Sequence, residues 1–344
     1  MPGAGLSTGG RGGERINPSA DGLQRARALH AGPICAAPAG SLTAAPSDDE
    51  VQGTCRIGFD RIIETDRPIR GTLAAPACVD EGRGAGEGRS TSIRICWHPP
   101  IAGQPGEPPI WLLTGDALHF AAPGVADYRC TSALIEVTPI VGARDAMIEA
   151  LLIATALPAV LWLQGEFMLH AAAIVPHDRL DNAALAIAGA SGCGKSRLAA
   201  AFLAKGADLV ADDSIAVRMV DQDQGSPRCA GLAGGYHLAG QGERAFHPVA
   251  DRHTRRVARL AAVVVLQDGP RACRTRLGVI DSIEALLANR HRPSVPRRCG
   301  LEPRALDDAA LLARTVPVYR WPREDADALL DDDIRRTIMR NGGE

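Results

Sequence analysis

Two short segments of the chain combine residue types that handle phosphate. The first, GASGCGKS, fits the phosphate-loop pattern G-x-x-x-x-G-K-[ST]. Its glycines let the backbone turn tightly and aim N–H groups at one point. Lys195, one of only two lysines in the chain, is expected to reach the β- and γ-phosphates of ATP, and the Ser196 hydroxyl to hold Mg²⁺. The predicted ATP-binding residues are Gly189, Ala190, Ser191, Gly192, Cys193, Gly194, Lys195 and Ser196.

The second segment is the pair Asp212 and Asp213, which follows the phosphate loop after a single helix. A helix of about 11 residues would rise about 16 Å from the loop. The strand Asp208–Ala211 would return about 13 Å, parallel to the strand before the loop. Both carboxylates are therefore expected beside the phosphates, where one can hold Mg²⁺ and the other can accept a proton from an attacking hydroxyl. The alternative is an ordinary acidic turn.

The elements around these segments read as an α/β domain. FMLHAAAIV and AALAIAG are continuous apolar runs, typical of strands buried on both faces. An amphipathic helix is predicted over Lys195–Lys205, then the strand DLVA, and later a central strand over Val257–Gln267. Further helices are expected over 281–290, 303–314 and 325–340, with VPVYRW between the last two.

The rest of the chain divides by composition. Residues 1–52 are rich in Gly, Ala, Ser and Pro, which predicts disorder. A small β-rich domain is expected over 53–142, from RIGFDRIIE, STSIRICW, PIWLLTG and ALIEVTPI. A connecting helix over 143–166 should kink or end near Pro158, and the catalytic domain is expected over 167–344.

Bulk composition excludes several classes of partner. The formal net charge of −2 gives no general attraction to nucleic acid or to an anionic membrane. The longest apolar run, Ala150–Leu163, is too short to span a bilayer. Nine cysteines without metal-type spacing suit a reducing compartment. We therefore expect a cytoplasmic protein that binds neither nucleic acid nor membrane.

The region from LHAAAI through GASGCGKS to KGADLVADD resembles the C-terminal catalytic domain of HPr kinase/phosphorylase and its HPr-kinase-like relatives. The close similarity covers about 50 residues. The resemblance implies a P-loop kinase domain like that of phosphoenolpyruvate carboxykinase, and phosphorylation of a serine in a small protein or peptide with ATP and Mg²⁺. It also implies that Asp213 is the general base, that Asp212 and Ser196 lie at the metal, and that His170 lies near the site.

One departure from that family affects the substrate. The bifunctional enzymes carry a second signature, E-x-R-G-x-G, whereas CAGLAGGYHLAGQGER stands in this chain. This puts phosphorylase activity, and HPr as the acceptor, in doubt. A β-rich domain followed by a helix and L-H-A is similar to the kinases of lasso-peptide precursors. Two alternatives remain open, an ATP-binding regulator without kinase activity and a small-molecule kinase, and so does assembly as a homo-oligomer.

Two basic clusters lie in the C-terminal half. Either could clamp the transferring phosphate or the acceptor, but a solvated basic surface is the more common role of such clusters. No metal spacing is recognised for His237, His247 and His253. The clusters comprise Arg252, His253, Arg255, Arg256 and Arg259, and Arg290, His291, Arg292, Arg297 and Arg298.

Overall fold

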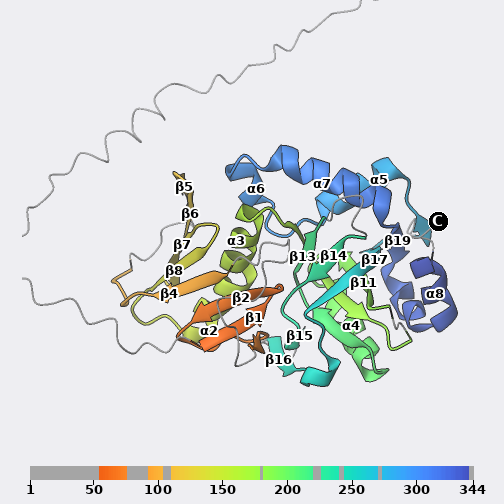
Figure 1. The fold of residues 1–344 in the computed structure, drawn as a ribbon, viewed down its shortest axis with the longest axis horizontal. Helices are drawn as coiled ribbons and strands as arrows, with labels where there is room; N and C mark the ends of the chain where they lie inside the picture. The colour runs from red at the N-terminus through yellow and green to blue at the C-terminus, as the bar shows by residue number, and fades with distance from the viewer. Residues whose placement is uncertain are drawn as a thin grey trace, which may run out of the picture. The chain divides into compact units, whose positions relative to one another are not determined.

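The computed structural model describes residues 54–75, 92–103, 110–178, 181–219, 226–239, 244–269 and 273–340. Val51–Glu344 form one compact unit of mixed α/β structure, which contains two large sheets (Figure 1). The disorder predicted for residues 1–52 lies outside the described residues. The predicted division at residues 142 and 166 stays a prediction.

The first sheet contains eight strands in the order β3-β1-β2-β4-β8-β7-β6-β5. The β2–β4 and β4–β8 pairs are parallel and the other pairs are antiparallel. Alternate residues point inward, as expected for a sheet with one covered face. The strands are β1 (Thr54–Gly58), β2 (Arg61–Thr65), β3 (Leu73–Ala74), β4 (Ile93–Trp97), β5 (Ile110–Thr114), β6 (Ala117–Ala122), β7 (Ala126–Cys130) and β8 (Leu134–Pro139).

The segment RIGFDRIIE differs from the single strand that the sequence predicted. It forms a hairpin, because Phe59 and Asp60 both adopt positive φ angles, of 55° and 56°. Two consecutive residues of this kind make the tight turn that matches the twist of a two-stranded hairpin. Neither residue is glycine, so the usual turn signal is missing from the sequence.

The connecting helix does not end near Pro158, which was one of the two predicted outcomes, and the other outcome, a kink, stays a prediction. It runs without interruption as α2 (Asp145–Leu151), a π-helical turn η1 (Leu152–Ala156) and α3 (Leu157–Leu163). The π turn lies directly before Pro158, where the proline ring would clash with a regular α-helix. At 19 residues and a mean hydropathy of 2.0, Asp145–Leu163 is long and apolar enough to cross a membrane, but 56% of it is buried inside the protein, as in many core helices.

The second sheet carries the phosphate loop. Its main path is β12-β10-β11-β17-β14-β13-β9, and β19 pairs with β17 and β18. The β11–β17 and β17–β19 pairs are parallel, and β10 is antiparallel to both β11 and β12. The strands are β9 (Phe167–Leu169), β10 (Ala171–Val175), β11 (Ala183–Gly189), β12 (Asp208–Ala211), β13 (Ile215–Arg218), β14 (Arg228–Ala230), β17 (Val257–Gln267), β18 (Thr275–Arg276) and β19 (Val318–Pro322). A separate hairpin is formed by β15 (Gly235–Ala239) and β16 (Arg244–Pro248).

The apolar run FMLHAAAIV is two strands rather than one. His170 separates the two strands. β9, before it, pairs with β13, and β10, after it, lies between β11 and β12. The predicted strand DLVA is β12, and it runs parallel to β11 with β10 between them. His170 therefore lies at a branch between two parts of the same sheet.

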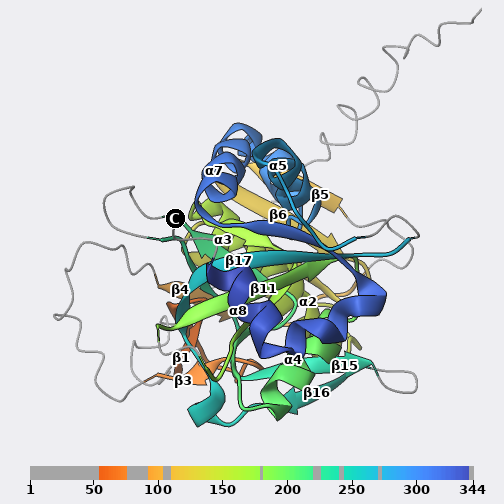
Figure 2. The same ribbon diagram turned by 90° about the vertical axis from the view of Figure 1, so that its right-hand side faces the viewer.

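Helices cover both faces of the second sheet, with α5 and α7 on one side and α4 and α8 on the other (Figure 2). One apolar cluster joins Leu198 and Phe202 of α4 to Leu329 and Ile338. A second joins Leu286 and Leu312 to the first sheet and to α3. The helices are α4 (Lys195–Ala204), η2 (Asp251–His253), α5 (Val279–Ala288), α6 (Ser294–Arg298), α7 (Glu302–Thr315), η3 (Arg323–Leu330) and α8 (Asp332–Arg340). The predicted helix over 325–340 is thus a 3₁₀ segment followed by α8.

Candidate active site

The sheet topology gathers three segments at one edge. β11 ends at Gly189 and β12 ends at Ala211, and the two strands run in the same direction. Because β10 runs opposite to both, its first residue Ala171 pairs with Ala188 at that same edge. The phosphate loop, the two aspartates and His170 therefore come together. The spacing of the aspartates predicts their return to the loop, and the position of His170 is the one that the family resemblance implies.

The phosphate loop is tightly packed at Gly189, where it leaves β11, and faces open space at Gly192 and Gly194. A Cβ on Gly189 would lie 2.8 Å from Cys193 Sγ and 2.9 Å from Leu266 O, so only glycine fits there. Gly192 and Gly194 adopt φ angles of 81° and 100°, with open space where a Cβ would be. Lys195 is 5% exposed, and its Nζ donates to Gly189 O at 2.8 Å and Ala190 O at 3.1 Å. The ammonium group thus lies at the centre of the loop.

The first turn of α4 adds an anion-binding feature. Gly194 is the N-cap and no side chain caps the helix. The first N–H groups of a helix have no partner within the helix, and they carry the positive end of its dipole. A phosphate group above the loop would meet these amides together with Lys195.

Asp212 is clamped between the loop helix and the β15–β16 hairpin. Its Oδ1 accepts from Ser196 Oγ at 2.7 Å, and its Oδ2 accepts from the His237 backbone N–H at 2.8 Å. Burial raises the pKa of Asp212, as does the neighbouring Asp213, while these two hydrogen bonds oppose the increase. A partly buried carboxylate beside a serine hydroxyl is a suitable place for a cation.

Asp213 turns away from Asp212 because the backbone reverses between them. The Ser214 N–H donates to Asp212 O at 3.0 Å, which closes a three-residue turn with Asp213 at its centre. Asp213 has a φ of 71°, as in the strained form of the γ-turn. Its Oδ1 lies 3.3 Å from His170 Nε2. Such backbone strain is concentrated at functional sites.

A further segment, 289–292, lies against His170. The His170 N–H donates to Asn289 O at 2.8 Å, and the His291 N–H donates to Met168 O at 2.9 Å. The rings of His170 and His291 meet edge to face with centroids 5.5 Å apart. Burial lowers the pKa of His291 to about 4, and burial also lowers the pKa of Arg292. The negative charge of Asp213 opposes the decrease in both residues.

The residues fit Mg²⁺ and a nucleotide by the chemistry of their donors. Ser196 and Asp212 offer two adjacent oxygens, and Mg²⁺ is typically held by one or two protein ligands together with phosphate oxygens and water. Within the described ranges, no group of three or more His, Cys, Asp or Glu side chains could hold a metal without such help. The site therefore fits a metal that arrives with phosphate.

The two basic clusters separate in the fold. In the first cluster, Arg255 pairs with Asp208 at 2.7 Å and Arg259 pairs with Asp181 at 2.6 Å, both at the edge opposite the phosphate loop. In the second cluster, the charge of Asp213 acts on His291 and Arg292, whereas Arg290 and Arg297 pair with Glu302. Sequence reasoning gave His291 and Arg292 no specific role, and it assigned no site to His237. The Leu169–Arg290 bridge positions His291 and Arg292 at the site, and the β15–β16 hairpin positions His237 there. No local sequence pattern identifies them.

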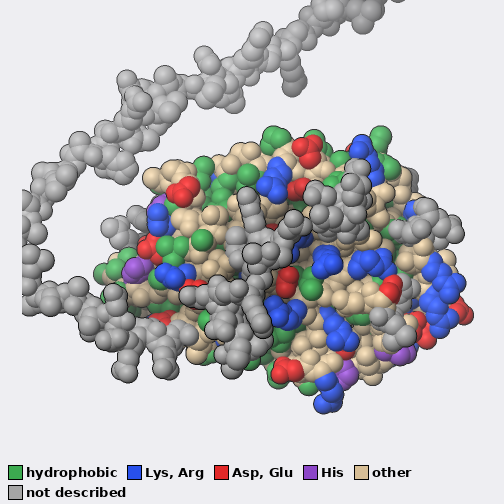
Figure 3. Space-filling view, viewed as in Figure 1, with side chains coloured by type: hydrophobic (Ala, Val, Ile, Leu, Met, Phe, Trp, Pro, Cys, Tyr) green, Lys and Arg blue, Asp and Glu red, His purple; other side chains and the backbone are tan. Residues whose placement is uncertain are grey.

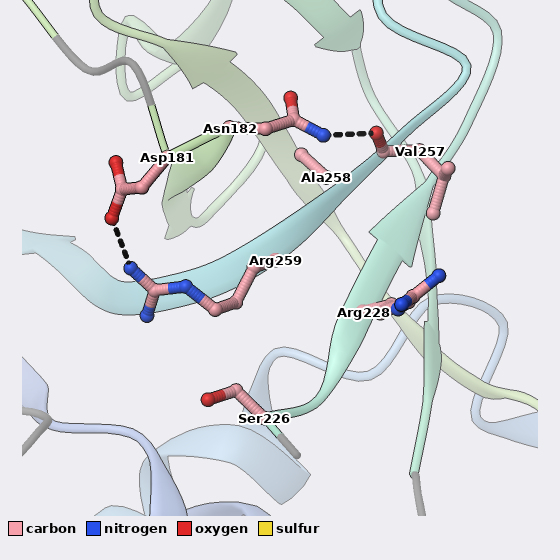
Figure 4. A pocket seen from close by; sticks show the side chains of 7 residues that line it. All are labelled: Asp181, Asn182, Ser226, Arg228, Val257, Ala258 and Arg259. Carbon is pink, nitrogen blue, oxygen red and sulfur yellow. Dashed lines mark hydrogen bonds and ion pairs between the residues drawn. The ribbon is translucent and has the colours of Figure 1, made fainter. Parts of the chain in front are cut away.

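A cavity of about 360 Å³ does not belong to this site. It opens where β11 and β17 begin, at the edge opposite the loop (Figure 4). Asn182 Nδ2 donates there to Val257 O at 3.0 Å. On the face in Figure 3, basic side chains are interspersed with acidic ones, which agrees with the small net charge. The cavity is lined by Asp181, Asn182, Ser226, Arg228, Val257, Ala258 and Arg259.

Comparisons with known proteins give a weak similarity in structure. No protein-family model matches the chain, and neither does any curated protein. Among solved structures, the chain is similar to the HPr(Ser) kinase/phosphatase from Coxiella burnetii, with 14% sequence identity and a TM-score of 0.31. The match covers 51% of this chain and 99% of that one. A score this low is insufficient for assigning function, which depends on the site itself.

Proposed function

We propose that the chain is a kinase that uses ATP and Mg²⁺ to phosphorylate a serine of a small protein or peptide. The observation that carries the proposal is the separation of the two aspartates. Asp212 bonds to the phosphate-loop serine, whereas Asp213 turns toward His170. A nucleotide switch needs the first arrangement only, and a phosphoryl transferase uses both.

The proposed reaction assigns each group one task. Lys195 and the loop amides bind the β- and γ-phosphates, and Ser196 and Asp212 hold Mg²⁺, which neutralises phosphate charge when bound. The acceptor hydroxyl oxygen forms a bond to the γ-phosphorus while the bond from that phosphorus to the β,γ-bridging oxygen breaks, releasing ADP. The hydroxyl proton moves to the Asp213 carboxylate.

Two acceptors are proposed, and they differ in chemical context. One is an HPr-like carrier protein, which the resemblance of the loop region suggests. The other is a ribosomally made precursor peptide of the lasso type, which the preceding β-rich part and the missing E-x-R-G-x-G signature favour. A cytoplasmic location and a homo-oligomer are compatible with either acceptor.

The test is transfer of label from γ-³²P-ATP to candidate acceptors, followed by mapping of the modified residue. HPr and any precursor peptide encoded beside the gene should be compared with a Ser→Ala version of each. A phosphoserine that disappears in the Ser→Ala acceptor supports the proposal. If ATP binds and changes the shape of the protein but no acceptor is labelled, a regulator without kinase activity is the better description. Label on a small metabolite would indicate a small-molecule kinase.

The nucleotide site has its own control within the chain. Lys195→Ala should abolish labelling and weaken Mg-ATP binding in calorimetry, because the chain has only one other lysine, Lys205. Lys205 is exposed, and its Nζ donates to Leu330 O at 3.1 Å on the outside of the fold. Lys205→Ala removes the same charge and should leave binding unchanged. Equal Mg-ATP affinity in folded Lys195→Ala and Lys205→Ala proteins would contradict the phosphate-loop assignment.

A further inference from the structure

The connecting helix presents the Ala154 carbonyl group to the segment 289–292. Pro158 has no N–H, so it cannot donate the i→i−4 bond to Ala154 O that a regular helix would form. The Ala154 carbonyl accepts from Arg292 Nε at 2.5 Å and from His291 Nε2 at 2.9 Å. A backbone oxygen only accepts, so His291 must carry its proton on Nε2. A proline in one element thus permits two contacts from another.

Arg292, which donates to this carbonyl, also carries a charge that interacts with that of the candidate base. The contact to Ala154 uses Nε, and a guanidinium has four further N–H groups in a rigid plane. The charge of Asp213 acts on the Arg292 guanidinium. The backbone of Arg292 has a φ of 53°, which is uncommon for a residue other than glycine. Fixing Nε therefore fixes the orientation of a positive charge near Asp213.

The segment that carries Arg292 is itself held beside His170. Leu169 and Arg290 form an antiparallel bridge, and backbone hydrogen bonds join His170 to Asn289 and Met168 to His291. The Trp162 indole Nε1 of α3 donates to His291 O at 2.9 Å. The connecting helix thus holds the segment at two points, Trp162 and Ala154.

We propose that Arg292 is a positioning residue for Asp213, and that Pro158 maintains it by leaving Ala154 O open to the guanidinium. The proposal rests on the proposed kinase function. In it, Asp213 is oriented from two sides, by His170 and by the charge of Arg292. A base that lies about 1 Å from its productive position costs up to about 10² in rate.

The first test measures the contact between Arg292 and Ala154 O, here called the anchor, and requires no measurement of enzyme activity. Thermal unfolding midpoints are compared for the wild type, Pro158→Ala, Arg292→Ala and the double variant. The alanine introduced by Pro158→Ala supplies an N–H that competes for Ala154 O, so losing Arg292 should lower the midpoint less in that background than in the wild type. Additive shifts would overturn the anchor, whether or not the protein is a kinase.

The second test measures the effect on catalysis, with release of ADP from Mg-ATP by transfer to water as the probe. Arg292→Ala should lower kcat about 10-fold or more with the KM for Mg-ATP within about twofold, as expected when orientation and not binding is lost. Arg292→Lys keeps the charge but not the planar fork, so it should recover only part of the rate. Pro158→Ala should lower kcat in the same direction without a fall in thermal midpoint.

The matched control is Arg304→Ala. Arg304 Nη2 also donates to a backbone oxygen near the end of this helix, Gly165 O at 2.7 Å, but it lies outside the candidate site. Arg304→Ala should keep the wild-type kcat. Unchanged kcat in Arg292→Ala would overturn the positioning role even where the unfolding data support the anchor. If the wild type neither binds Mg-ATP nor releases ADP, the proposed function is wrong, and so is the positioning role. The unfolding data would still show whether Arg292 and Ala154 O interact as proposed.

Discussion

His170 and Asp213 meet at the edge of the second sheet, with Nε2 3.3 Å from Oδ1. Both side chains are partly exposed, which leaves the pair open to an incoming group. When His170 carries its proton on Nε2, it donates to Oδ1 and helps to orient the carboxylate. The arrangement matches that of a base held by a neighbouring hydrogen-bond donor.

Asp213→Asn should separate binding from transfer. Asparagine also tolerates a positive φ, so the turn at Asp213 should persist. The amide cannot accept the proton, and transfer to the acceptor should fall by about 10²–10⁴. Mg-ATP affinity by calorimetry should stay close to that of the wild type. The exposed Asp251→Asn is the control, and transfer at the wild-type rate in Asp213→Asn would remove Asp213 from the base role.

The parts of this site that the sequence predicts are those encoded by contiguous residues. The phosphate loop is local, because its glycines, lysine and serine act through one turn and one helix. The position of Asp212 and Asp213 follows from one further strand. The expected return to the loop is confirmed by the 2.7 Å bond from Ser196 to Asp212. The mixed α/β architecture is likewise readable from alternating apolar runs and amphipathic helices.

The parts that escaped prediction depend on long-range pairing. The charge of Asp213 acts on His291 and Arg292, and the bridge between Leu169 and Arg290 joins these distant segments. The His237 N–H reaches Asp212 through a hairpin whose role no spacing shows. Pro158 predicted a kink or an end of the helix, and the helix continues past it after a π-helical turn. In each case the tertiary contact, rather than local propensity, decides the outcome.

His291 should make the fold sensitive to acid. Burial lowers its pKa from 6.5 to about 4, so the unfolded chain binds a proton more readily than the native protein between these values. Stability is therefore lost as the pH falls from about 6.5 toward about 4. Between pH 7.5 and pH 5 the loss should be about 2 kcal/mol, measured by urea unfolding. His291→Gln should reduce this pH dependence and the exposed His177→Gln should not, and equal slopes in all three proteins would contradict the assignment.

A buried ion pair joins the first sheet to the catalytic sheet. Arg61 and Glu166 are 4% and 5% exposed, and Arg61 Nη2 donates to Glu166 Oε1. Burial raises the pKa of Glu166, and the Arg61 charge opposes this. Glu166→Leu would leave the guanidinium buried without its carboxylate, which costs about 3–5 kcal/mol of unfolding free energy.

The double variant Arg61→Met with Glu166→Leu should be more stable than Glu166→Leu alone, because no unpaired charge stays buried. The pair Arg94–Glu64 on the same sheet serves as the control. Its side chains are 68% and 38% exposed, and Arg94→Met should change the unfolding free energy little. If the unfolding free energy lost in the double variant equals the sum of the losses in Arg61→Met and Glu166→Leu, the two residues are not energetically coupled.

Gly235→Ala should disturb the metal site from a distance. A Cβ on Gly235 would lie 2.3 Å from the Phe246 ring and 2.7 Å from His247 O, so the β15–β16 hairpin must shift. The His237 N–H would then lose its 2.8 Å bond to Asp212 Oδ2. Loss of a partner that orients a metal ligand typically weakens metal binding by about 10–100-fold. The Mg²⁺ concentration for half-maximal ATP binding should rise in this range, while Gly278→Ala, whose Cβ meets nothing within 4 Å, should leave it unchanged. A folded Gly235→Ala protein with wild-type Mg²⁺ dependence would show that Asp212 does not need the hairpin.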